Sequence, residues 1–435
     1  MNTESTSLLL NIIDKLLFSG GNKVPKRSLF SSLGISSKKF LIVFVLLFNS
    51  FIWFFMNLFI LNTALKNANA NTVLVSWTIY LIAIVGSSLL GALVSPRPNR
   101  HALIYAWLLL GVITSLLLSA LAINVSFDYL LIIIFFSGIA FGLGMPLTLA
   151  YFAEYTTFEN RGQIGGIIFF ATNLGIAAAA LFLGTRLAID SYAAAIWRTI
   201  GLAIIFLLKP IEESRGQRKT VPFKGVLSNR AFVLFLVPWF MFCLIDRFEY
   251  QIFLNSPKLG ANLGAWSLLV EPIVGTVFAL VGGLLADWVG RKKVVVSGFV
   301  ALGLAYAVLG VATGTLFAQY FYIVIDGIAW GIFLVLFVLI LWGDLASTIG
   351  GQEKYYAVGS IPFFIAYLTQ YLVKPYLASI PVGTFEVSFS FASLFLFVAI
   401  LPLIYAPETL PEKKIQERQI RKYVEEAKKV VKKGE

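Results

Sequence analysis

Residues 283–292 read Gly283-Leu-Leu-Ala-Asp287-Trp-Val-Gly290-Arg291-Lys292, between two long apolar stretches. A shorter echo, Gly91-Ala-Leu-Val-Ser95, ends an apolar stretch 192 residues earlier. Glu154 and Asp344, which each follow another apolar stretch, are 190 residues apart. Because independent landmarks agree on a repeat of about 190 residues, the sequence predicts two similar halves, which is typical of membrane proteins that enclose a central cavity.

The composition indicates a membrane protein. Of the 435 residues, 59% are hydrophobic and 13% are charged, whereas a soluble domain is about 25% charged. This excludes an ordinary soluble enzyme, a disordered chain and a nucleic-acid-binding module. A spanning helix needs roughly 20 apolar residues. We expect twelve such helices, at 41–64, 72–94, 101–123, 128–152, 162–184, 190–208, 232–254, 265–287, 294–316, 318–343, 356–377 and 386–406.

The positive charges predict the orientation. With the N-terminus inside, 28 Lys and Arg residues fall on the inner side and three in the outer loops. Such an excess marks the cytoplasmic side, so both termini are expected in the cytoplasm. The predicted organisation is a tail (1–40), a six-helix bundle (41–208), a linker (209–231), a second bundle (232–406) and a basic tail (407–435). The basic tail could lie on lipid headgroups or form a solvated helix.

The stretch Gly283–Lys292 resembles the cytoplasmic signature of the major facilitator superfamily. In the first-half copy Ser95 replaces the aspartate. The resemblance covers roughly residues 40–410 and implies an all-α membrane fold of twelve helices in two pseudo-symmetric six-helix bundles. Other elements resemble the sugar-porter branch, namely Pro146, Tyr151, Glu154, Arg161, Gly162, Trp197-Arg198, Glu213-Ser214-Arg215 and Pro407-Glu408-Thr409.

One departure from that branch concerns the solute. Family hexose carriers place a glutamine eight residues after the arginine that matches Arg161, and here that position is Phe169. We therefore expect weak or no hexose binding. The resemblance implies a transporter but does not identify its solute.

The signature predicts a conformational latch on the cytoplasmic side. Asp287 ends one helix and Gly162 begins another, and a carboxylate stabilises the N–H groups at a helix start. Arg291 is expected to pair with Asp344, and Arg97 or Arg100 with Glu154. The alternative is a set of solvated loop charges of little energetic value. The predicted latch residues are Gly283, Asp287, Gly290, Arg291, Asp344, Glu154 and Arg161. Since Ser95 lacks a charge, Ser95→Asp is expected to strengthen closure.

Ionisable residues inside membrane spans are costly and usually functional. The proton-coupling candidates are Asp246, Glu249, Glu271 and Asp326, all in the second half. Asp246 and Glu249 are three residues apart on one helix face, with Arg247 beside them. The alternative is that Glu249 and Glu271 reach outer water and that Asp246 pairs for structure only.

The candidates for contact with a solute are Asn49, Asn173, Arg247, Gln370 and Trp330. For the amides, hydrogen bonding between helices is an equal alternative. We expect Arg198 to extend toward the outer interface rather than to bind solute. Asn124 begins a glycosylation sequon in a short outer loop.

These observations predict a monomeric carrier in the cell membrane that moves a small polar organic solute by alternating access, with proton coupling. The alternatives are an organic-anion or carboxylate carrier, an uncoupled facilitator and a non-transporting receptor on a carrier scaffold. A membrane enzyme is disfavoured because the chain has one histidine, His101, and one cysteine, Cys243, and no paired-acid metal motif. We expect no cofactor, no metal and no nucleic-acid partner.

Overall fold

A computed structural model describes residues 33–95, 100–120, 127–184, 186–210, 221–255, 265–347, 349–377 and 385–411. Asn124, Arg97 and nearly all of both predicted tails lie outside these ranges. Within them the chain is helical and contains no strand. The first half contains α3 (Ser37–Leu65), α4 (Ala70–Val94), α5 (Arg100–Ser119), α6 (Phe127–Gly142), α7 (Met145–Tyr155), α8 (Arg161–Phe182) and α9 (Leu187–Leu208). The second half contains α10 (Phe223–Leu227), α11 (Arg230–Asn255), α13 (Ala265–Val289), α14 (Arg291–Val311), α15 (Leu316–Phe333), the π-helix η3 (Leu334–Ile340), α16 (Leu341–Ser347), α17 (Gln352–Leu377) and α18 (Phe385–Tyr405).

Twelve helical spans in the described part of the chain are long and apolar enough to cross a membrane. The expected twelve-helix fold is therefore confirmed. The fourth span consists of α6 and α7, and the tenth consists of α15, η3 and α16.

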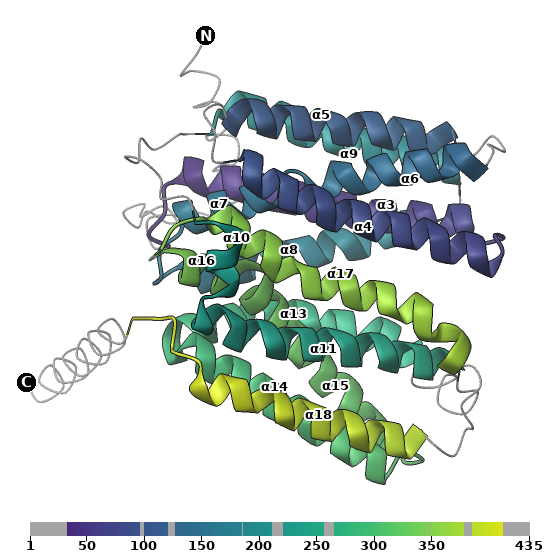
Figure 1. The fold of residues 1–435 in the computed structure, drawn as a ribbon, viewed down its shortest axis with the longest axis vertical. Coiled ribbons are helices and arrows are strands. Elements are labelled where there is room, and N and C mark those ends of the chain that lie inside the picture. The colour runs from purple at the N-terminus through teal and green to yellow at the C-terminus, as the bar shows by residue number, and fades with distance from the viewer. Residues whose placement is uncertain are drawn as a thin grey trace, which may run out of the picture.

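The two halves repeat the same packing. In the first half α4 packs on α6 and α5 on α9, and in the second half α13 packs on α15 and α14 on α18. Figure 1 shows the long helices of the first half, purple to blue-green, above those of the second half, green to yellow. The halves meet where α8 packs on α13 and α4 on α17.

The fourth and tenth spans are interrupted near their middles. In the fourth, Pro146 lies in the first turn of α7, where its missing N–H is tolerated. At the same break a Cβ on Gly144 would lie 2.1 Å from the Trp107 ring, so only glycine fits there. In the tenth, the helix widens into the π-helix η3. Such π segments are uncommon and frequently occur at functional sites.

Glycines bring α8 and α13 into backbone contact. A Cβ on Gly162 would lie 2.3 Å from the Gly283 carbonyl oxygen, and a Cβ on Gly283 would lie 2.1 Å from the Gly162 oxygen. This contact joins the halves at the end of the molecule formed by residues 155–162 and 287–291, which we call the signature end. In Figure 1 that end lies to the left, near α7 and α16.

Candidate functional site

Asp287 lies at the start of the helix α8 of the opposite half. Its carboxylate accepts hydrogen bonds from the backbone N–H groups of Gly162, at 3.0 Å, and Gln163, at 2.7 Å. These are two of the N–H groups that lack partners within a helix, and they carry partial positive charge. The buried carboxylate therefore joins the second half to the first.

Asp344 is the centre of a buried ion-pair network at the same end. One carboxylate oxygen pairs with Arg161 from the first half, and the other accepts from Arg291 Nε at 3.1 Å. Thr409 donates its hydroxyl to the second oxygen at 3.0 Å. Arg291 also donates to the carbonyl oxygen of Phe158 in the first half, at 2.6 Å. Arg291 also pairs with Asp287 at 2.9 Å, so closure of the signature end buries two arginines against two aspartates.

The segment after the last span completes this network. Glu408 accepts from the backbone N–H groups of Arg291, at 2.8 Å, and Lys292, at 3.1 Å, and so caps α14. Gly290 has φ +114°, and a Cβ there would lie 2.5 Å from Glu408 Oε2. Glycine is required at 290 both for its backbone angle and for the space that Glu408 occupies.

The first-half copy of the signature uses a residue that sequence analysis missed. Arg100 pairs with Glu154 at 3.0 Å within its own half, and with Glu353 of the second half at 2.5 Å. Ser95 donates its hydroxyl to Glu353 at 3.3 Å. Glu353 lies in the first turn of α17. The carboxylate missing at position 95 is therefore supplied from the opposite half.

A Gly162→Ala variant tests whether close backbone contact is needed for closure. The new Cβ would also lie 2.6 Å from Asp287 Oδ1, so we expect the halves to separate at the signature end. Spin labels on Thr157→Cys and Ser347→Cys, in a Cys243→Ala background, report this separation as a longer distance by pulsed EPR. Both label positions are exposed, one in each half.

The control for this variant is Gly86→Ala, where an added Cβ meets nothing within 4 Å. It should leave the distance between the labels unchanged. A Gly162→Ala protein with the parent distance would show that the contact of α8 and α13 does not govern closure.

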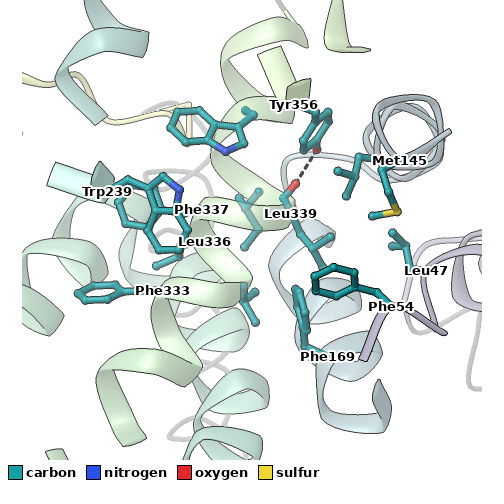
Figure 2. Close-up of a cluster of buried hydrophobic side chains, with 14 of the residues drawn as sticks. Leu47, Phe54, Met145, Phe169, Trp239, Phe333, Leu336, Phe337, Leu339 and Tyr356 are labelled. Carbon is teal, nitrogen blue, oxygen red and sulfur yellow. Dashed lines mark hydrogen bonds between the residues drawn. The ribbon is translucent and has the colours of Figure 1, made fainter. Parts of the chain in front are cut away.

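A cavity of about 120 Å³ lies between the halves. Its lining is dominated by aromatic and aliphatic side chains. Figure 2 shows Trp239 and Phe337 of the second half on one side and Phe54 and Phe169 of the first half on the other. None of the described residues that line the cavity is charged. Leu334, Phe337 and Val338 of η3 form part of its wall, which places the π-helix at the cavity.

The amide side chains predicted to contact a solute are divided between the cavity and the helix interfaces. Asn173 lines the cavity. Asn49 does not, because its amide donates to the Trp197 carbonyl oxygen at 2.7 Å and accepts from Arg198 at 3.0 Å. Gln370 is buried in α17, outside the cavity lining.

The expectation that Arg198 reaches the outer interface is wrong. Its side chain is fully buried, and it donates to Asn49 and to the hydroxyl of Ser50 at 2.8 Å. The guanidinium lies over the rings of Trp53, at 4.8 Å, and Trp107, at 4.3 Å. Cation–π contacts of this kind stabilise a desolvated arginine. Trp53 and Trp107 are visible in the sequence, but their contact with Arg198 depends on how three helices pack.

Charged residues of the second half form a cluster beyond the cavity. Asp246 pairs with Arg247 at 2.5 Å and accepts from Trp330 Nε1 at 2.7 Å. The Arg247 guanidinium lies over the ring of Tyr367 at 5.2 Å. Asp246 and Arg247 are adjacent in the sequence and so point about 100° apart around the helix, and the length of the arginine side chain allows them to meet.

The other carboxyl groups of the second half lie near this pair. Glu249 is buried and accepts from the Tyr306 hydroxyl, to which Tyr322 donates at 3.3 Å. Asp326 is buried, and Glu271, Glu249 and Asp246 are near enough to repel it electrostatically. In the described part of the chain, one cation, Arg247, acts on Asp326 against these acids. We call Asp246, Glu249, Glu271 and Asp326 the carboxyl cluster.

Two repeated six-helix bundles around a shared cavity define the fold of a membrane carrier. The chain belongs to the Major Facilitator Superfamily, which it matches over residues 40–361. It is thus a transporter of that superfamily rather than an enzyme. A search of curated protein sequences finds no match.

Three solved structures show the same fold at low sequence identity. The human organic anion transporter MFSD10 (TETRAN) is 14% identical, with a TM-score of 0.63, over 84% of this chain and 99% of that one. The E. coli fucose:proton symporter FucP is 11% identical, with a TM-score of 0.63, over 85% and 98%. The nucleoside transporter NupG is 14% identical, with a TM-score of 0.55, over 85% and 99%.

Proposed function

We propose that this protein is a secondary carrier that moves a small organic solute across the cell membrane by alternating access, coupled to protons. The observation that carries the proposal is the position of the carboxyl cluster. Among the described residues, four acids of one half lie beyond the central cavity, with Arg247 as the cation paired to one of them. Buried carboxylates without cations are strongly disfavoured, so such a cluster holds protons when the site is closed to water.

Alternating access is supported by the contacts between the halves. At the signature end Asp287, Asp344 and Glu353 all bind groups of the opposite half. At the other end Trp77 of α4 stacks on Tyr371 of α17, with ring centroids 5.4 Å apart. The two ends are thus held by separate sets of contacts, and rocking of one half against the other breaks one set at a time. In the topology predicted from the sequence, 28 of the 34 Lys and Arg residues fall on the side of the signature end, and we therefore assign this end to the cytoplasm.

The solute we propose is not a hexose, although several loops resemble those of sugar porters. Phe169 lines the cavity and packs against Phe51, with ring centroids 5.3 Å apart. It leaves no side-chain hydrogen-bonding group at the position where hexose carriers place a glutamine. An organic anion is the favoured alternative, because the cavity is apolar and Arg247 lies beyond its outer end.

Proton coupling is tested on the protein without solute. The distance between labels at Thr157→Cys and Ser347→Cys should depend on pH in the parent protein, because gaining a proton lowers the cost of closing water out of the cluster. We expect this dependence to be lost in Asp246→Asn or in Asp326→Asn. Loss in only one variant would identify the coupling residue.

The matched control is Asp190→Asn. Asp190 is a buried acid of the first half that accepts from the Gly184 N–H at 2.8 Å, far from the cluster. This variant should keep the parent's pH dependence. If both cluster variants also keep it, the protein is an uncoupled facilitator.

A further inference from the structure

The cavity wall indicates which part of a solute it receives. Its apolar lining includes Phe51, Phe54, Phe55, Phe141, Phe169, Trp239, Phe337, Trp342, Phe363 and Phe364. The volume of about 120 Å³ is close to that of an engineered apolar cavity, about 150 Å³, that admits a benzene ring. Flat aromatic side chains prefer offset-stacked or edge-on aromatic partners. The cavity therefore fits one aromatic ring.

The cavity also has a site for a polar atom. Thr172 is fully buried in its wall, and its hydroxyl makes no hydrogen bond. A helical threonine ordinarily donates to a carbonyl oxygen one turn earlier, as Thr199 does to Ala195 at 2.8 Å. Leaving a buried hydroxyl without a partner is unfavourable. A bound molecule that carries a hydrogen-bonding group would satisfy it.

A cationic group, Arg247, lies about two helical turns beyond the cavity on α11. Trp239 lines the cavity, and Asp246 follows it by seven residues on one face of α11, a rise of roughly 10 Å. Arg247 lies over Tyr367, whose ring is 6.2 Å from that of Phe363 in the cavity wall. The arginine is thus one aromatic layer beyond the cavity.

We propose that the solute is an aromatic carboxylate whose ring occupies the central cavity and whose carboxylate binds Arg247. This inference rests on the proposed carrier function and names its substrate class. A polyol is disfavoured because most of its hydroxyls would lie against rings. A neutral aromatic molecule offers no charge that could compete with Asp246 for Arg247.

The same arrangement explains how one proton accompanies one anion. Without solute, Asp246 pairs with Arg247. An arriving carboxylate takes the place of Asp246 at the guanidinium, and Asp246 takes up a proton while it keeps the hydrogen bond from Trp330. One negative charge and one proton enter together, so the net charge of the site does not change. The groups that face Asp246 are Cys243, Arg247, Glu249, Glu271, Asp326 and Trp330, and Tyr367 faces its partner Arg247.

Binding is measured by calorimetry on purified full-length protein with three probes. They are 3-phenylpropionate, 3-phenylpropanol, which lacks the acid, and hexanoate, which lacks the ring. We expect 3-phenylpropionate to bind about tenfold or more tightly than either of the others. Three results would each overturn the proposal. They are equal binding of 3-phenylpropionate and 3-phenylpropanol, equal binding of 3-phenylpropionate and hexanoate, and no binding of any probe.

Two variants locate the ends of the bound probe. Arg247→Gln should abolish the preference for acid over alcohol and leave the preference for a ring. Ser360→Phe fills the cavity, which Ser360 lines, and should abolish the binding of 3-phenylpropionate. Thr199→Phe adds the same bulk at an exposed position of α9 and should bind the probe like the parent. Unchanged binding by either of the first two variants would contradict the assignment.

Failure of this inference is distinguishable from failure of the proposed function. If a pH-dependent label distance is lost in Asp246→Asn but no probe binds, coupling stands and the substrate class is wrong. If 3-phenylpropionate binds with these preferences but proteoliposomes do not accumulate it under a proton gradient, the proposed substrate class is correct and the proposed proton coupling is wrong.

Discussion

An Asp344→Asn variant is expected to open the signature end. In the closed protein the Asp344 side chain is inaccessible to solvent and pairs with Arg161 and Arg291. Without the carboxylate, Arg161 keeps only neutral partners, Thr156 and the Ala153 carbonyl oxygen. An uncompensated buried charge costs about 3–5 kcal/mol. Opening hydrates Arg161, so the ratio of open to closed protein should rise by roughly two to four orders of magnitude.

The measurement is the distance between spin labels at Thr157→Cys and Ser347→Cys, which should shift to a longer, open value. Asp190→Asn, a buried aspartate of the opposite end, should keep the parent distance. Arg161→Gln combined with Asp344→Asn removes the unpaired charge and should recover part of the closed population. If Asp344→Asn stays closed, or if the double variant opens further, the ion pair does not control this end.

The fold was predictable from the sequence because hydropathy and repetition are properties of the chain alone. Apolar stretches of spanning length give the number of helices, and the repeat of Gly283 and Asp287 in Gly91 and Ser95 gives the two halves. The interruption of the tenth span was not predictable. The π-helix η3 lies in a continuous apolar run with no proline or glycine to mark it, and it is set by packing against both halves.

Contacts made within one half were easier to predict than contacts between halves. The pairing of Arg291 with Asp344 follows from the repeat, as does that of Arg100 with Glu154. Pairing of Arg161 with Asp344 depends on how the halves meet. Arg198 was misplaced because the rings of Trp53 and Trp107 come from other helices. The aromatic character of the cavity was equally hidden, since lipid-facing and cavity-facing phenylalanines look alike in the sequence.

The contact that Ser95 makes in the first-half copy of the signature overturns an expectation drawn from the sequence. Restoring the missing acid with Ser95→Asp was expected to strengthen closure. The structure places the Glu353 carboxylate 3.3 Å from the Ser95 hydroxyl. A second carboxylate there would face the first inside a buried contact, and like charges about 4 Å apart repel by roughly 4 kcal/mol at an effective dielectric constant of 20. We therefore expect Ser95→Asp to open the signature end.

The decisive variant exchanges the two groups. Glu353→Gln alone leaves Arg100 with Glu154 and should open the signature end less than Ser95→Asp does. Combined with Ser95→Asp, it leaves Arg100 with Glu154 and with one further carboxylate, now at position 95 near the start of α17, as Asp287 lies at the start of α8. The double variant should therefore be more closed than either single variant, as read from the distance between the Thr157 and Ser347 labels. Additive effects would refute the exchange, because residues that share a contact are coupled and independent ones are not. Stronger closure by Ser95→Asp alone would show that Glu353 does not occupy the place of the missing aspartate.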